Sequence, residues 1–156
     1  MSIFDQIMSN QVLISACAGW LTAQVLKALI DMWITGRFRP ERLYGNGGMP
    51  SSHSATVCGL FTSAGLMYGL SSSEFGISFI LAVVVMVDAV GVRRETGKQA
   101  KLLNMMMEED FWNFDDPEAF QIRLKEFVGH TPIQVFCGAI LGILVAFILN
   151  AVFYST

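Results

Sequence analysis

Long apolar runs alternate with short polar segments along this chain, and four of the runs approach the length of a membrane-spanning helix. They cover approximately residues 12–34, 51–70, 75–92 and 132–153. A helix needs about 20 apolar residues to cross the hydrocarbon core of a bilayer. The pattern therefore predicts an all-α integral membrane helical bundle with about four transmembrane helices.

The connection between the third and fourth runs is about 40 residues long and contains a different helix pattern. Asp116 and Pro117 are suited to the N-cap and the first helical position. Apolar residues then recur at helical spacing on one face; they are Phe120, Leu124, Phe127 and Val128. An amphipathic helix lying at the membrane interface explains this pattern. A helix that caps the bundle as part of its core is the alternative.

Composition supports the membrane prediction, because 53% of the residues are hydrophobic and only 15% are charged. At 156 residues, the chain is expected to form a single membrane-embedded domain over residues 1–156. The formal net charge of −3 gives no reason to expect a nucleic acid partner. The three cysteines all lie in apolar runs, so we interpret them as small buried residues and not as a disulfide framework.

Basic residues are confined to one side of the predicted bundle. All ten lysines and arginines lie in or beside the first and third connections, whereas the "SSSE" turn between the second and third runs has none. Four spans place the first and third connections on the same side of the membrane. Because cytoplasmic loops carry an excess of Lys and Arg, this multi-pass protein is expected to have its basic face in the cytoplasm.

The chain has only two histidines, and each precedes or begins an apolar run. His53 lies in "GNGGMPSSHSAT", where Pro50 suits a first helical turn, and His130 lies in "GHTPIQV", where Thr131 and Pro132 suit an N-cap and a first position. Both histidines are therefore predicted at helix N-termini on the basic face. Helix N-termini present backbone N–H groups and partial positive charge, which favour anions such as phosphate.

Each of these features also has an ordinary interpretation. A histidine at a helix start is more often a cap or an interface residue, and the Arg93–Arg94 pair after an apolar run is usually a topology signal. Gly65 with Gly69, and Gly138 with Gly142, are most simply helix-packing positions. The convergence of histidines, serines and cations on one face favours a phosphate site.

Three blocks of the sequence resemble a known protein family. "GGMPSSH" and "GHTPIQVFCGAILG" resemble the type 2 phosphatidic acid phosphatase superfamily, and "DAVGVRRETGKQAKLLN" resembles its divergent bacterial and plant branch. The resemblance extends from about Lys27 to Gly142. It implies that His130 is the nucleophile that becomes phosphohistidine and that His53 is the general acid for the leaving group.

The resemblance also implies a set of phosphate-binding residues. They are Lys27, Arg39, Ser51, Ser52 and one or both of Arg93 and Arg94.

The chain departs from the superfamily pattern in several places. Lys27 lies twelve residues before Arg39, where the superfamily has a spacing of seven, and Leu124 occupies the usual arginine position before His130. Gln134 stands where the superfamily has an aspartate that orients the nucleophile. An amide can fix the imidazole tautomer but cannot stabilise an imidazolium by charge. Asp88 is the candidate to supply that charge.

These observations predict a metal-independent phosphatase that acts on a lipid phosphate or diphosphate through phosphohistidine. No cofactor and no metal site are expected, since no cluster of His, Cys or carboxylates has metal-ligand spacing. An anionic-lipid-binding protein with weak or no activity, built on the same pocket, is the alternative, and a structural membrane subunit is a third. The expected partners are the lipid phosphate and membrane lipids, with a homodimer that completes the bundle as an alternative to a monomer.

Overall fold

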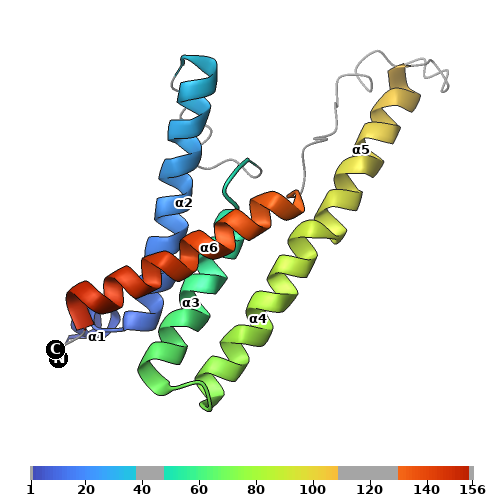
Figure 1. Ribbon diagram of the computed structural model, residues 1–156. Helices are drawn as coiled ribbons and strands as arrows, with labels where there is room; N and C mark the ends of the chain where they lie inside the picture. Colours follow the sequence, from blue (N-terminus) through green and yellow to red (C-terminus); the bar gives the residue numbers. More distant parts are fainter. Residues whose placement is uncertain (1, 38–47, 109–129, 155–156) are drawn as a thin grey trace.

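The computed structural model describes residues 2–37, 48–108 and 130–154, and all of its regular elements there are helical (Figure 1). In chain order they are α1 (Ile3–Met8), α2 (Gln11–Thr35), α3 (Ser52–Tyr68), α4 (Ser73–Val90), α5 (Val92–Glu108) and α6 (Pro132–Leu149), which continues as a π-helical turn, Asn150–Tyr154. The all-α membrane bundle is thereby confirmed. The amphipathic helix predicted from Asp116 and the site residue Arg39 lie outside the described residues.

Among the residues that the structure describes, three helical stretches are long and apolar enough to cross a membrane. They are α2, the continuous stretch Ser73–Met106 formed by α4 and α5, and Pro132–Phe153, which includes α6. The remaining predicted span, the second run at residues 51–70, corresponds to α3, whose 17 residues rise about 26 Å. It is shorter and more polar than the others, with buried Ser54, Thr62 and Ser63. Helix α3 packs against α2, α4 and α6, so its polar face is covered by protein instead of lipid (Figure 1).

Side-chain caps set where the helices begin. The N-cap residues are Ser2, Asn10, Ser51, Ser72 and Thr131. Thr131 forms a reciprocal capping box with Gln134, and Pro132 follows at the first helical position, as the sequence predicted. At α3 the prediction was one residue early, because Pro50 precedes the cap and Ser51 supplies the hydroxyl that accepts from the Ser54 N–H.

Small residues let the backbones of α2, α3 and α6 approach closely. A Cβ atom added at Gly19 would lie 2.7 Å from the Ala55 carbonyl oxygen, and one at Gly59 would lie 2.9 Å from that of Ser15. A Cβ atom at Gly142 of α6 would lie 2.9 Å from the Ala55 Cα and would meet the same carbonyl oxygen that faces Gly19. Helices α2, α3 and α6 therefore meet by backbone contact at Ala55, which fixes how far α3 is shifted along the other two.

Gly138 and Gly142 act as the close-packing pair that their spacing indicated, whereas Gly65 and Gly69 serve other purposes. Gly65 faces the ring of Phe75 and the side chain of Leu70. Gly69 ends α3 with a φ of +83°, a conformation that a residue with a Cβ atom rarely adopts.

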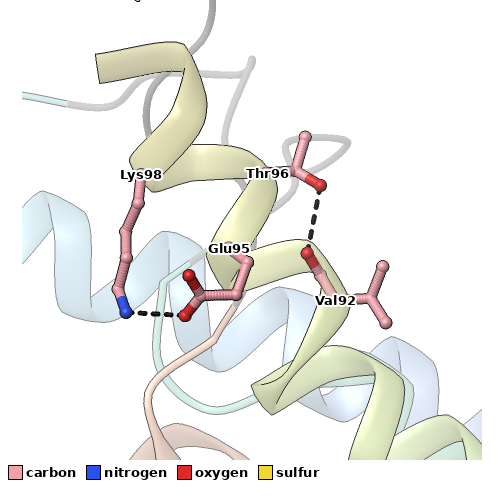
Figure 2. A network of polar contacts seen from close by, with 4 residues as sticks. All are labelled: Val92, Glu95, Thr96 and Lys98. Atoms are coloured by element: carbon pink, nitrogen blue, oxygen red, sulfur yellow. Dashed lines mark hydrogen bonds and ion pairs between the residues drawn. The ribbon is translucent and has the colours of Figure 1, made fainter. Parts of the chain in front are cut away.

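The first part of the long connection is a helix that the sequence analysis did not predict. Helix α5 begins directly after α4 and extends beyond the rest of the bundle (Figure 1). Its first turns contain a hydrogen bond from Thr96 Oγ1 to the Val92 carbonyl oxygen and an exposed ion pair of 2.6 Å between Lys98 and Glu95 (Figure 2). Such an exposed pair contributes at most about 1 kcal/mol. Gly91 is the single residue between α4 and α5, and its N–H still donates to the Val87 carbonyl oxygen at 2.8 Å.

Candidate functional site

The two histidines meet at one end of the bundle, although they are distant in sequence. Their ring centroids lie 5.8 Å apart with an interplanar angle of 61°. His53 is in the first turn of α3, and His130 lies directly before the N-cap of α6. The N-termini of two helices therefore converge on the space beside the rings, where their N–H groups favour an anion.

Backbone hydrogen bonds hold the two histidine segments in place. The Ser51 N–H donates to the Gln134 carbonyl oxygen at 3.0 Å, which joins the start of α3 to the first turn of α6. The His130 N–H donates to the carbonyl oxygen of Ala89 in α4, also at 3.0 Å. Because both links use main-chain atoms, the separation of the histidines is set by helix packing and not by flexible side chains.

Gln134 determines the tautomer of His130. Its Oε1 atom lies 3.3 Å from His130 Nδ1 and also accepts the Thr131 N–H at 3.0 Å. An amide oxygen can only accept, so the proton must be on Nδ1. The other ring nitrogen, Nε2, therefore carries the lone pair, and a neutral imidazole in this tautomer can act as a nucleophile.

A buried cation lies beside the first turn of α3. Lys27, which is only 5% exposed, donates from Nζ to Ser52 Oγ at 3.0 Å and to Gln24 Oε1 at 3.2 Å. Among the residues that the structure describes, no carboxylate forms an ion pair with it. A charge that is buried with only neutral partners is costly, so this position favours an anionic ligand.

The serines next to His53 have different roles. Ser52 contacts Lys27, whereas Ser51 is fully buried and uses its hydroxyl to cap α3, accepting at 3.4 Å from the Ser54 N–H and at 3.1 Å from the Ser54 hydroxyl. Ser51 thus holds the helix start, and its carbonyl region faces Gly138 of α6. Of the two serines, Ser52 is the one whose hydroxyl contacts the cation.

The remaining predicted residues lie around this centre. Asp88 is half-buried and precedes Ala89, whose carbonyl holds the His130 segment. Arg93 and Arg94 belong to the first turn of α5, and Arg94 is exposed, with no hydrogen bond or ion pair to either histidine in the described part of the chain. The structure therefore brings the histidines, Lys27, Ser52 and Gln134 together and leaves Arg94 at the periphery.

Two contributors to the site were not identified from the sequence. Gln24 lies three residues before Lys27 on the same helix, so the i, i+3 spacing was a signal that could have identified it. The Ala89 carbonyl had no such signal, since a backbone acceptor on α4 is recognised only when the helices are packed.

The chain is similar in sequence to known proteins. A model of the Divergent PAP2 family matches residues 8–145. The uncharacterized membrane protein YuiD of Bacillus subtilis (strain 168) is 41% identical over 153 residues, covering 92% of this chain and 96% of that protein. No solved structure matches the chain significantly. The matched region includes both histidines, Lys27 and Gln134.

Proposed function

Because this chain belongs to the Divergent PAP2 family, we propose that it is an integral-membrane phosphatase that hydrolyses lipid phosphates or diphosphates without a metal, through phosphohistidine. The observation that carries the proposal is the pairing of the two histidine rings, 5.8 Å apart, beside a buried lysine.

His130 is assigned to nucleophilic attack. Its Nε2 lone pair forms the N–P bond while the bond from phosphorus to the lipid oxygen breaks. His53, protonated, transfers its proton to the leaving alkoxide or phosphate oxygen, and the dephosphorylated lipid departs. His53 then removes a proton from water, which attacks the phosphohistidine and releases inorganic phosphate, returning both histidines to their starting states.

Fixed positive charge supports this chemistry. The transferred phosphoryl group carries its negative charge on three oxygens, so catalysis depends mostly on positioning and electrostatic stabilisation. Lys27, held by Ser52 and Gln24, supplies a cation, and the first N–H groups of α3 supply oriented dipoles. Arg39, Arg93 and Arg94 remain candidates for further phosphate contacts, and Asp88 for a compensating negative charge.

A second function follows from Gln134. The amide orients His130 but adds no negative charge when the imidazole becomes positive. Replacing the carboxylate partner of a catalytic histidine by an amide lowers kcat by roughly 10⁴ in serine proteases. A protein with this pocket that does not hydrolyse its ligand would be an anionic-lipid-binding protein.

Phosphate release distinguishes the two functions. The purified chain in mixed micelles with a chelator present is given phosphatidate, phosphatidylglycerol phosphate and a polyprenyl diphosphate. The enzyme should release phosphate from at least one of them, and His130→Ala and His53→Ala should abolish the release. Wild type should also acquire a labelled phosphoryl group that is stable to alkali and lost in acid, as phosphohistidine is.

The control for these variants is Lys98→Ala, which removes an exposed charge from α5 that pairs with Glu95. It should keep wild-type activity. If the wild type binds the lipid phosphates but releases nothing from any of them, the binding function replaces the enzymatic one.

A further inference from the structure

We propose that one hydrocarbon chain of the substrate lies in an apolar groove between α4 and α6, and that Ala139 at the deep end of this groove limits which chains are accepted. This inference rests on the proposed function. The groove has a volume of about 640 Å³, and all of its lining residues are apolar. Val90, Gly91 and Pro132 form its upper end, and Met86, Val135 and Ala139 lie deeper.

The groove is continuous with the candidate phosphate site. Ala89 and His130, joined by the hydrogen bond from the His130 N–H, stand at its upper end, one residue from Val90 and two from Pro132. From Pro132 to Ala139 the lining descends along α6 by about 10 Å. A lipid whose phosphate reaches His130 would therefore have its first carbons at the mouth of the groove.

The two regions match the two ends of an amphiphile. Lys27 is a buried cation with only neutral partners in the described residues, which complements an anionic head group. The groove lies on helices that qualify as membrane spans, and its rim residues Val87 and Phe136 are 65% and 66% exposed towards the surrounding medium. A chain could therefore enter laterally from the bilayer while the head group stays in the polar site.

The dimensions favour a single chain over a protein partner. A volume of about 640 Å³ is within the range of small-molecule sites. A helix of a second protein or a second copy of this chain is about 10 Å across with its side chains and would have to rest on the rim.

The deep end of the groove is closed by the core of the bundle. Ala139 and Met86 both pack against the buried cluster of Val57, Cys58 and Ala82. The small side chain at Ala139 leaves space that a larger one would fill. Ala139→Leu should therefore shorten the groove from below without touching the histidines or Lys27.

The experiment compares one head group on two tails. Full-length protein in mixed micelles is assayed with a long-chain lipid phosphate and with a short, water-soluble phosphate monoester. Ala139→Leu should lower kcat/KM for the long-chain substrate roughly tenfold, as expected when one or two buried CH₂ groups are excluded. The value for the short substrate should stay within about twofold of wild type, which also shows that the variant is folded.

A matched pair of variants tests the rim. Phe136→Ala widens the rim and should change the long-chain to short-chain ratio of kcat/KM at least threefold. Phe147→Ala, on the same helix, 50% exposed and outside the groove, should not change it. Equal effects of Ala139→Leu on both substrates, or no effect on either, would overturn the proposal.

A binding readout separates this proposal from the proposed function. A long-chain lipid phosphate with a photoreactive group in mid-chain should crosslink to residues 132–139 in wild type and several-fold less in Ala139→Leu. If wild type releases no phosphate but shows this crosslink, the phosphatase proposal fails and the groove stands. Equal crosslinking of an uncharged diacylglycerol would mean that the groove holds ordinary bilayer lipid. Crosslinking to residues outside 132–139 would place the hydrocarbon chain on another surface. Either result refutes the groove assignment.

Discussion

Gly142→Ala is expected to destabilise the bundle and to disturb the histidine pair, even though Gly142 lies about three turns from His130. The new Cβ atom would lie 2.9 Å from both the Cα and the carbonyl carbon of Ala55, and closer still to its oxygen. Ordinary contacts begin at about 3.4 Å, so the two backbones would have to separate by at least half an ångström. Overpacking of this kind costs about 1–3 kcal/mol.

Gly19 of α2 faces the same Ala55 carbonyl oxygen, 2.7 Å from where its own Cβ would be, so α2, α3 and α6 meet at this carbonyl. Separating α3 from α6 moves the start of α3, which contains His53, relative to the first turn of α6, which positions His130. Misplacement of catalytic groups by about 1 Å can lower a rate roughly a hundredfold. We expect a loss of about 2–3 kcal/mol of stability and a tenfold to hundredfold loss of phosphate release.

Equilibrium unfolding in mixed micelles, followed by tryptophan fluorescence, measures the change in the free energy of unfolding. The phosphate assay measures the loss of activity. The matched control is Gly76→Ala, because a Cβ atom at Gly76 in α4 meets nothing within 4 Å. Removing glycine from a helix there should stabilise the protein by about 0.5–1 kcal/mol. If Gly142→Ala is as stable and active as wild type, the close approach of α3 and α6 does not set the site geometry.

Three further changes test the site and its orientation. Gln134→Glu keeps an acceptor oxygen for His130 Nδ1 and the Thr131 N–H and adds a negative charge that raises the pKa of the neighbouring imidazole. We expect kcat to rise roughly tenfold or more and the acid limb of the pH–rate profile to move to higher pH. An unchanged profile would show that Gln134 takes no part in catalysis. Lys27→Met should weaken inhibition by vanadate roughly 10²–10³-fold without loss of stability, because it removes a buried charge; Lys98→Met is the control and should leave vanadate affinity unchanged. In a cysteine-free background, Ser71→Cys should react with an impermeant maleimide on intact cells and Arg37→Cys only after permeabilisation; the reverse labelling would place the histidine pair on the outer face.

The sequence by itself determined the local features of this protein. The apolar runs predicted the membrane helices, because crossing a bilayer requires a minimum length of apolar helix whatever the helix packs against. Thr131 and Pro132 predicted the start of α6, since capping involves only residues within one turn. The same local rules placed both histidines at helix N-termini, and that placement was enough to indicate an anion site.

The tertiary structure decided which of the candidate residues meet. Lys27 donates to Ser52 across 25 positions of sequence, and the His130 N–H donates to the carbonyl oxygen of Ala89, which lies 41 positions earlier. Sequence periodicity does not predict such pairs, because they depend on how far the packed helices are shifted along one another. Close backbone contacts at glycines set that shift here. The groove between α4 and α6 has the same origin. Its walls are ordinary apolar residues in each helix, and only the packing of the two helices makes them one surface beside the histidines.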